Sequence, residues 1–321
     1  YLAGWALLNL KRTRLAPWLL SASLTLAAGD VLYWSHQRFW HSDLRVTAVD
    51  VGQGAATLME LPGGKVILYD GGGFADNRFF DMGRLVIAPL LWSRKIATVD
   101  VLVLSHPNAD HLNGLIYVAR HFAVRELWTN GDANTTWGYR ELINVCRERS
   151  IAVKTLDRSH GKFSFDPVAL EILHPPARSR EHADALDQED RNDLSLVLRA
   201  AYGRTAFLLT GDITARAEAM LVQGAGDERL AGSVLFAPHH GSRTSSSPAL
   251  IAAVRPAAVV ISDGAGNRFG FPHPEVVARY RRAGSRVYCT GTHGAIVLYS
   301  DGQSVRIETF SGDRDEFTAR P

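Results

Sequence analysis

Cysteine is scarce in this 321-residue chain, and its scarcity excludes two classes of site. The two cysteines, Cys146 and Cys289, lie far apart and form no CxxC pattern, so neither a zinc–thiolate site nor a disulfide-stapled scaffold is indicated. Charge of one sign is also lacking, because 35 Lys and Arg against 33 Asp and Glu leave a net charge of +2. A polyanionic substrate would therefore need a local basic patch on this protein.

The first 42 residues differ in character from the rest. A basic cluster at 11–14 precedes an apolar run at 15–29, which residues 31–34 extend beyond Asp30. This run approaches the ~20 residues that span a bilayer. Since the chain begins at Tyr1 rather than Met, we expect 1–42 to be a transmembrane-like helix and linker that ends a longer membrane region. The basic end would be cytoplasmic and residues 43–321 would lie outside. The alternative is a core helix of the globular domain.

A turn rich in histidine and aspartate, SHPNADH at 105–111, is the most informative motif. It follows an apolar strand-like segment at 99–104 and precedes a helix-like segment at 112–122. The turn can therefore bring His106, Asp110 and His111 together at the end of a buried strand. Imidazole and carboxylate groups are the ligands of hydrolytic divalent metals that keep an open position for water. The alternative is a helix N-cap with merely polar histidines.

Three further apolar runs end in residues of the same type. Asp212 follows the run at 207–210, His239 and His240 follow the run at 234–237, and His273 opens a helix-like segment. Asp212 alone would suggest a turn, and His240 alone a surface histidine. Four such strand ends in one chain argue for a shared site.

The order of elements predicts an α/β fold built on two sheets. Residues 44–70 contain three short apolar runs separated by glycine and proline, which indicates a meander of antiparallel strands. From residue 99 onward, strand-like and helix-like segments alternate. An αββα sandwich, with two mixed β-sheets packed face to face and helices outside, suits this order.

These motifs together resemble the metallo-β-lactamase superfamily, and more narrowly the C-terminal domain of the ComEC family of DNA-uptake channel proteins. The resemblance covers about residues 44–300 and rests on the 105–111 turn and Gly211-Asp212. It also rests on DVGQG (50–54), YDGG (69–72), NDLSLVL (192–198), PHHGS (238–242) and residues 267–274. It implies a metallo-β-lactamase-like hydrolase domain at 43–321 with a divalent-metal centre. It also implies a place at the inner (cell) membrane, on the periplasmic or extracellular side of a channel.

A two-metal hydrolytic site needs ligands on both sides of a shared water. Asp110 and His111 are expected to face one ion, and His106, with Asn108, the other. Asp212 is the natural bridge, because an anionic oxygen can bind two ions. The superfamily pattern favours His240 as the last ligand, with His239 as the alternative.

The chain departs from the family pattern at three positions. Asn108 stands where most of the superfamily has His, Asn192 takes the place of a third His, and Ala55 replaces an acidic residue. These changes weaken the His106 side and leave a better set of Asp110, His111, Asp212 and His240. Its oxygen content favours Mn²⁺, with Zn²⁺ or Mg²⁺ as alternatives, in one or two ions.

Substrate contacts are expected just after His240. Ser242, Arg243, Thr244 and Ser245 can bind a phosphate, or they can cap the helix that starts near Pro248, and a helix N-terminus is itself an anion site. Asp110 and His273 are expected to act in catalysis, with a supporting or capping role as the alternative for His273.

Two other groups of residues have simpler expected roles. Asp50 and Asp70 are expected as turn aspartates that accept backbone hydrogen bonds rather than as metal ligands. Four aromatic residues near loop-like segments are candidates to stack bases, although most are expected in the core: Trp92, Trp128, Trp137 and Phe269.

The leading hypothesis is a metal-dependent nuclease domain that degrades the non-imported DNA strand during natural transformation. Its expected partners are DNA, single-stranded above all, the membrane, the channel region of the same polypeptide and other DNA-uptake proteins. One alternative is a non-catalytic domain that guides or gates DNA with a decayed metal site. Another is a periplasmic phosphodiesterase on a different phosphoester, such as choline phosphate.

Overall fold

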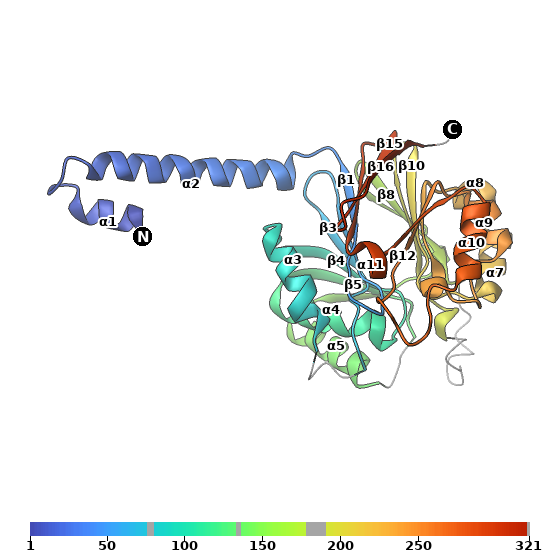
Figure 1. The fold of residues 1–321 in the computed structure, drawn as a ribbon. Helices are drawn as coiled ribbons and strands as arrows, with labels where there is room; N and C mark the ends of the chain where they lie inside the picture. The colour runs from blue at the N-terminus through green and yellow to red at the C-terminus, as the bar shows by residue number, and fades with distance from the viewer. Residues whose placement is uncertain (76–79, 133–135, 178–190, 320–321) are drawn as a thin grey trace. The chain divides into compact units, whose positions relative to one another are not determined.

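The computed structural model describes residues 1–75, 80–132, 136–177 and 191–319 (Figure 1). The chain divides into two compact units, Tyr1–Ser42 and Asp43–Pro321. The first unit consists of the helices α1 (Leu2–Asn9) and α2 (Ala16–Phe39). Pro17 lies in the first turn of α2, where its missing N–H has no helical partner to lose.

Among the helices of the described ranges, none is both long enough and apolar enough to cross a bilayer. The transmembrane-like helix and linker expected at 1–42 stay a prediction. A helix does form there, but Asp30 and the serine, threonine and histidine residues of α2 interrupt its apolar character.

Over the described residues, the second unit holds a nine-stranded and a seven-stranded sheet. The nine-stranded sheet has the order β16-β15-β14-β1-β2-β3-β4-β5-β6, and the seven-stranded sheet has the order β13-β12-β11-β10-β9-β8-β7. The first sheet comprises β1 (Leu44–Ala48), β2 (Thr57–Glu60), β3 (Val66–Tyr69), β4 (Thr98–Leu104), β5 (Ala123–Thr129), β6 (Ala152–Thr155), β14 (Ile296–Ser300), β15 (Ser304–Thr309) and β16 (Arg314–Thr318). The second comprises β7 (Lys162–Phe165), β8 (Val168–His174), β9 (Val197–Tyr202), β10 (Thr205–Leu209), β11 (Val234–Phe236), β12 (Ala258–Ile261) and β13 (Arg286–Cys289).

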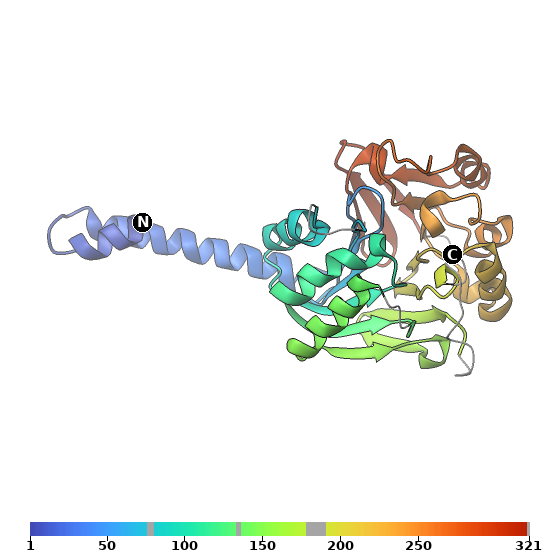
Figure 2. The same cartoon turned by 90° about the horizontal axis from the view of Figure 1, so that it is seen from below.

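Helices cover the outer faces of both sheets (Figures 1 and 2). On the nine-stranded sheet lie the π-helical turn η1 (Gly83–Ile87), α3 (Ala88–Ser93), α4 (Ala109–His121) and α5 (Trp137–Glu148). On the seven-stranded sheet lie α7 (Ala215–Ala225), α8 (Asp227–Leu230), α9 (Pro248–Val254) and α10 (Pro274–Arg282). Shorter turns of helix are η2 (Arg158–His160), η3 (Pro238–Gly241) and α11 (Thr290–His293).

The alternation of side chains along each strand produces three apolar layers. In β10, Phe207 and Leu209 pack between the two sheets, whereas Leu208 packs under α7, α9 and α10. In β3, Ile67 and Tyr69 likewise face the other sheet. Such two-residue periodicity is what a strand buried on both faces requires. The predicted αββα sandwich is confirmed.

Candidate metal centre

The carboxyl ends of parallel strands bring the polar site residues together. In one sheet, β3 and β4 are parallel neighbours, and they end just before Asp70 and His106. In the other sheet, β10 and β11 are parallel neighbours, and they lead into Asp212 and His240. The carboxyl ends of adjacent parallel strands share one edge of a sheet, so each sheet gathers its own polar site residues at one edge.

Helix α4 supplies the remaining side chains of the cluster. The helix begins at Ala109, within the 105–111 motif and just after its N-cap residue Asn108, so that Asp110 and His111 lie in its first turn. The carboxylate of Asp110 is favoured there because the helix N-terminus carries partial positive charge. The strand–turn–helix order of the sequence therefore determines where both side chains point.

Four side chains, from Asp110, His111, Asp212 and His240, present ligand atoms that all lie within 4.8 Å of one another. His111 Nε2 lies 3.2 Å from Asp212 Oδ1 and 3.3 Å from His240 Nε2. His240 Nε2 lies 3.5 Å from Asp212 Oδ2 and 3.6 Å from Asp110 Oδ2. Two ligands ~2.1 Å from a tetrahedral ion are roughly 3.4 Å apart. The spacing of these donors therefore fits one divalent cation.

Both imidazoles are oriented by a hydrogen bond at the nitrogen that faces away from the cluster. His111 Nδ1 lies 2.7 Å from Asp70 Oδ2, and His240 Nδ1 lies 2.8 Å from the carbonyl oxygen of Ser262. An Nδ1–H donated to these oxygens leaves both Nε2 atoms as free ligands. This carboxylate or carbonyl support is the usual arrangement behind a metal-binding histidine.

The turn that carries His240 has an unusual backbone. His239 and His240 have φ values of 50° and 53°, in the left-handed region that non-glycine residues rarely adopt. His240 is buried in the cluster, whereas His239 faces Thr244, with Nδ1 3.3 Å from Oγ1. Left-handed backbone costs roughly 1–2 kcal/mol per residue, and it persists where the surroundings hold it in place. The structure thus keeps strain at the residue that completes the cluster.

The charges of the cluster favour a cation. Burial acts to lower the pKa of His240, but the Asp212 charge and hydrogen bonds with Asp110 and Asp212 raise that pKa to about 10. The pKa of His111 is also raised, by Asp212 and Asp70 against the effect of burial. Without a cation, two protonated imidazoles would face each other at 3.3 Å. A divalent ion replaces both protons and removes this repulsion.

His106 lies beside the cluster with an unsatisfied nitrogen. Its Nε2 is buried without a hydrogen-bond partner among the described residues and lies 3.8 Å from Asp212 Oδ2. Burial lowers the pKa of His106 to about 3, so the ring is neutral. A buried polar atom left unpaired costs about 1–3 kcal/mol. This orphaned nitrogen is a second indication that the site accommodates a cation near Asp212.

Asn108 and Asn192, where the resemblance to the superfamily implied histidines, bond to each other. Asn108 Nδ2 donates to Asn192 Oδ1 at 2.9 Å. Ala55 also lies close by, since its N–H donates to the carbonyl oxygen of Asp110 at 3.1 Å. Ala55 thus contacts a cluster residue, and Asn192 contacts Asn108, two residues before Asp110.

An open cleft of about 1030 Å³ reaches the cluster at Asp110. The Asp110 side chain is 34% exposed, whereas the other three members are buried. Phe74, Phe80 and Phe269, each 42–48% exposed, line the cleft. The cleft gives an extended ligand access to the one cluster residue that is not buried.

The residues expected to contact substrate lie next to the cluster but are largely engaged by the protein. Ser245 Oγ is buried and donates to the carbonyl oxygen of Pro238 at 2.8 Å. Ser242 Oγ lies 3.1 Å from Thr244 Oγ1. Arg243 is exposed and pairs with Glu275 at 2.5 Å.

His273 lies outside the four-residue group. It is the N-cap residue of α10, and its ring lies 5.3 Å from the ring of Phe271. The stacked ring of Phe271 in turn lies 6.4 Å from that of His240. The Phe271 ring thus lies near both imidazoles, and the backbone N–H of His273 donates to the carbonyl oxygen of Gly241 at 3.0 Å, next to His240.

Two carboxylates have site roles that sequence patterns did not reveal. Asp70 is fully buried and accepts hydrogen bonds from Ser105 N and Oγ in addition to its contact with His111. Glu218 is fully buried in α7 and accepts from the backbone N–H groups of Ser246 and Ser247, which fixes the loop after His240. The YDGG motif was a signal for Asp70, whereas Glu218 resembles any polar residue of an amphipathic helix.

Comparisons with known proteins agree with this geometry. The family model of the metallo-beta-lactamase superfamily matches residues 49–262. Recombination protein 2 of Haemophilus influenzae is 32% identical over 252 residues, which cover 78% of this chain and 28% of that protein. Competence protein ComA of Neisseria gonorrhoeae is 30% identical over 282 residues, which cover 88% of this chain and 35% of that protein. ComE operon protein 3 of Bacillus subtilis is 26% identical over 265 residues, which cover 79% of this chain and 33% of that protein.

The chain spans about a third of the length of these curated relatives. The family match covers the strands and turns that carry every member of the cluster. The fold of that superfamily implies bound divalent metal, in line with the donor set described above. The chain belongs to the metallo-beta-lactamase superfamily, as a domain related to the competence proteins of the ComEC family.

Proposed function

We propose that residues 43–321 form a metal-dependent phosphodiesterase that cleaves DNA, with single-stranded DNA as the preferred substrate, within a DNA-uptake protein. One observation carries this proposal: Asp110 belongs both to the four-residue cluster and to the lining of the aromatic cleft. A strand bound in the cleft would therefore have a phosphate next to the cluster.

The cleft has the chemistry of a single-strand binding groove. Its exposed phenylalanines offer flat faces to unpaired bases, and stacking on an aromatic side chain contributes about 1–3 kcal/mol per base. The guanidinium of Arg268 lies 4.8 Å from the ring centre of Phe269, so a positive charge accompanies the stacking surface. Duplex DNA keeps its bases paired and would use less of this surface.

Each residue of the cluster and its surroundings would have a distinct role in phosphodiester cleavage. A divalent cation held by Asp110, His111, Asp212 and His240 would supply a Lewis acid that activates water and polarises a phosphate oxygen. Asp70 holds His111 in the tautomer that keeps Nε2 free. The hydrogen bond with His240 offsets the effect of burial and lowers the pKa of Asp110 to about 2, so its carboxylate stays ionised and can orient the attacking water. His273 is retained as the candidate proton donor to the leaving oxygen.

A second candidate function rests on the bond between Asn108 and Asn192. If these amides mark a decayed site, the domain would guide or gate DNA in the same cleft without cleaving it. In either case we place the domain on the outer side of the cell membrane, where incoming DNA arrives. Metal binding and cleavage separate the two functions.

The test is cleavage of end-labelled single-stranded and double-stranded oligonucleotides by the 321-residue chain. Reactions would contain Mn²⁺, Mg²⁺, Zn²⁺ or a chelator, with Asp110→Ala as the variant and Asp50→Asn as the control at an exposed aspartate. We expect metal-dependent cleavage, faster on single strands, that Asp110→Ala abolishes and Asp50→Asn retains. DNA binding without cleavage under every metal would favour the gating domain.

A further inference from the structure

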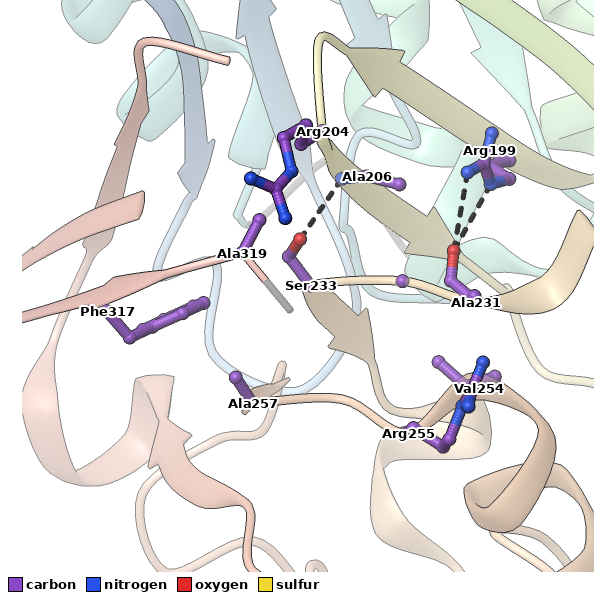
Figure 3. Close-up of a pocket in the computed structure, with 11 residues that line it drawn as sticks. Arg199, Arg204, Ala206, Ala231, Ser233, Val254, Arg255, Ala257, Phe317 and Ala319 are labelled. Carbon is purple, nitrogen blue, oxygen red and sulfur yellow. Dashed lines mark hydrogen bonds between the residues drawn. The ribbon is translucent and has the colours of Figure 1, made fainter. Parts of the chain in front are cut away.

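A second pocket lies at the other end of the seven-stranded sheet (Figure 3). Its volume is about 450 Å³, and its wall includes Arg199, Arg204, Arg255 and Phe317. Ligand sites in proteins typically measure roughly 300–1,000 Å³. The pocket is therefore large enough for a small molecule and is not part of the aromatic cleft.

The strand directions separate this pocket from the candidate metal centre. Arg204 precedes β10, Ser233 precedes β11 and Ala257 precedes β12, all of which run parallel. The metal-centre residues follow the carboxyl ends of the same strands. Asp212 is eight residues beyond Arg204, roughly 25 Å of extended chain. A ligand in the pocket would not occupy the cluster.

Two arginines of the pocket lack acidic partners. Over the described part of the chain, neither the Arg204 nor the Arg255 side chain forms an ion pair or hydrogen bond, and both are exposed. Arg199 is held in the wall by Nε and Nη2 bonds of 3.4 Å to the carbonyl oxygen of Ala231, visible in Figure 3. Glu171, the carboxylate that acts on Arg199, already pairs with Arg229. The pocket thus has an excess of positive charge.

The backbone places Arg255 at some energetic cost and anchors Arg204 through a hydrogen bond. Arg255 is the C-cap residue of α9 and has φ 51°, a left-handed position where glycine is usual. An arginine there costs roughly 1–2 kcal/mol in backbone energy relative to an ordinary conformation. Arg204 follows Gly203 in a tight turn, and its N–H donates to the carbonyl oxygen of Gly302 at 2.6 Å. Outliers of this kind concentrate at functional positions.

The remaining wall consists of Phe317 and mainly small side chains. Phe317 presents a ring on one side, and the small side chains of Ala206, Ala257 and Ala319 leave room beside it. A guanidinium group binds phosphate through paired N–H donors, and an aromatic ring stacks on a base. A ligand that combines a phosphate with a planar ring matches both parts of the wall.

We propose that this pocket is a binding site for a nucleoside monophosphate, with the phosphate held by Arg204 and Arg255 and the base against Phe317. The site is separate from the candidate metal centre and does not depend on DNA cleavage. It gives the domain a means to sense a free nucleotide while the cleft remains open.

The test is calorimetric titration of the chelator-treated 321-residue chain with deoxyadenosine monophosphate, inorganic phosphate and deoxyadenosine. The variant is Arg204→Gln with Arg255→Gln, which removes two charges but keeps polar side chains at both positions. The matched control is Arg140→Gln, an exposed arginine of α5 on the other sheet. Circular dichroism and thermal unfolding would show that the variants fold, as expected for exposed positions.

We expect the monophosphate to bind the wild type and the Arg140→Gln control at least tenfold more tightly than the double variant. Phosphate alone and the nucleoside alone should each bind at least tenfold more weakly than the monophosphate. Absence of binding to the wild type, or equal binding by the folded double variant, would overturn the proposal. Equal affinity for phosphate and monophosphate would overturn the assignment to a nucleotide.

Discussion

Asn108 Nδ2 donates a hydrogen bond to Asn192 Oδ1 at 2.9 Å, so the two amides satisfy each other beside the cluster. Their neighbour His106 keeps a buried Nε2 with no hydrogen-bond partner among the described residues. One side of the site thus has four donors suited to a cation. The other side has one unpaired imidazole nitrogen, Nε2 of His106, and two amides that are hydrogen-bonded to each other. This asymmetry is the basis for expecting one tightly bound ion rather than two.

The first prediction concerns metal stoichiometry. The wild-type chain is expected to bind one Mn²⁺ per molecule, because the amide pair offers no strong ligand. Replacing both amides, Asn108→His with Asn192→His, adds two imidazoles near His106 and should raise the stoichiometry toward two. Elemental analysis after gel filtration measures this ratio. Two ions per wild-type chain would contradict the expectation.

The second prediction tests the support of His111. Asp70→Asn retains the size of the side chain but removes the charge that holds His111 Nδ1–H at 2.7 Å. Loss of such outer support typically weakens metal binding roughly 10- to 100-fold. Asp50→Asn is the matched control, since Asp50 also follows a strand, but its carboxylate accepts a hydrogen bond only from the N–H of Gly52 among the described residues. Equal Mn²⁺ affinity for the two variants would count against the role of Asp70.

The third prediction tests the packing of the DVGQG turn on helix α4. A Cβ added to Gly54 would lie 2.4 Å from the carbonyl oxygen of Asp110, whereas one added to Gly63 would meet nothing within 4 Å. Both glycines have positive φ, so both alanine variants lose roughly 1 kcal/mol or more of stability. Gly54→Ala should additionally lower Mn²⁺ affinity at least tenfold because the Asp110 backbone must move. Metal titration of the two folded variants distinguishes strain alone from displacement of the ligand.

Much of the fold could be predicted because apolar periodicity reports burial directly. The run at 207–209 alternates between two cores in the structure, as a strand covered on both faces must. The four strand ends rich in ligand-type residues indicated one site, and Asp110, His111, Asp212 and His240 do lie together. Parallel strands explain this success. Their carboxyl ends lie side by side at one edge of a sheet, regardless of the sequence that connects the strands.

Other features could not be predicted from local patterns. The hairpin of β7 and β8 forms at 162–174, and its β7 half has little local signal because β7 is an edge strand with alternately exposed side chains. Asp70 was expected only to accept backbone hydrogen bonds, and it does accept one from Ser105, but its contact with His111 spans 41 residues. The aromatic cleft likewise brings together Phe74 and Phe269, which are far apart in the sequence. Such long-range contacts leave no periodic signal.

The fourth prediction concerns pH. In the cation-free protein the pKa of His240 is raised from 6.5 to about 10, so its charged form stabilises the fold. That contribution is complete below about pH 6.5 and is lost as pH rises toward 10, with each pKa unit worth about 1.4 kcal/mol. Chelator-treated wild type should therefore lose stability between pH 6.5 and 10 more steeply than His240→Gln. Denaturant unfolding across that range measures both slopes, and parallel slopes would contradict the prediction.

The central claim is that the ion held by the four-residue cluster carries out DNA cleavage. The most direct measurement titrates Mn²⁺ into the metal-free wild type and the Asp212→Asn variant, following bound metal and cleavage of single-stranded DNA in the same samples. We predict that binding and cleavage rise together in the wild type with one half-saturation concentration. In Asp212→Asn, both should fall by at least 100-fold. Cleavage that persists in this variant, or full metal binding by the wild type without cleavage, would contradict the account.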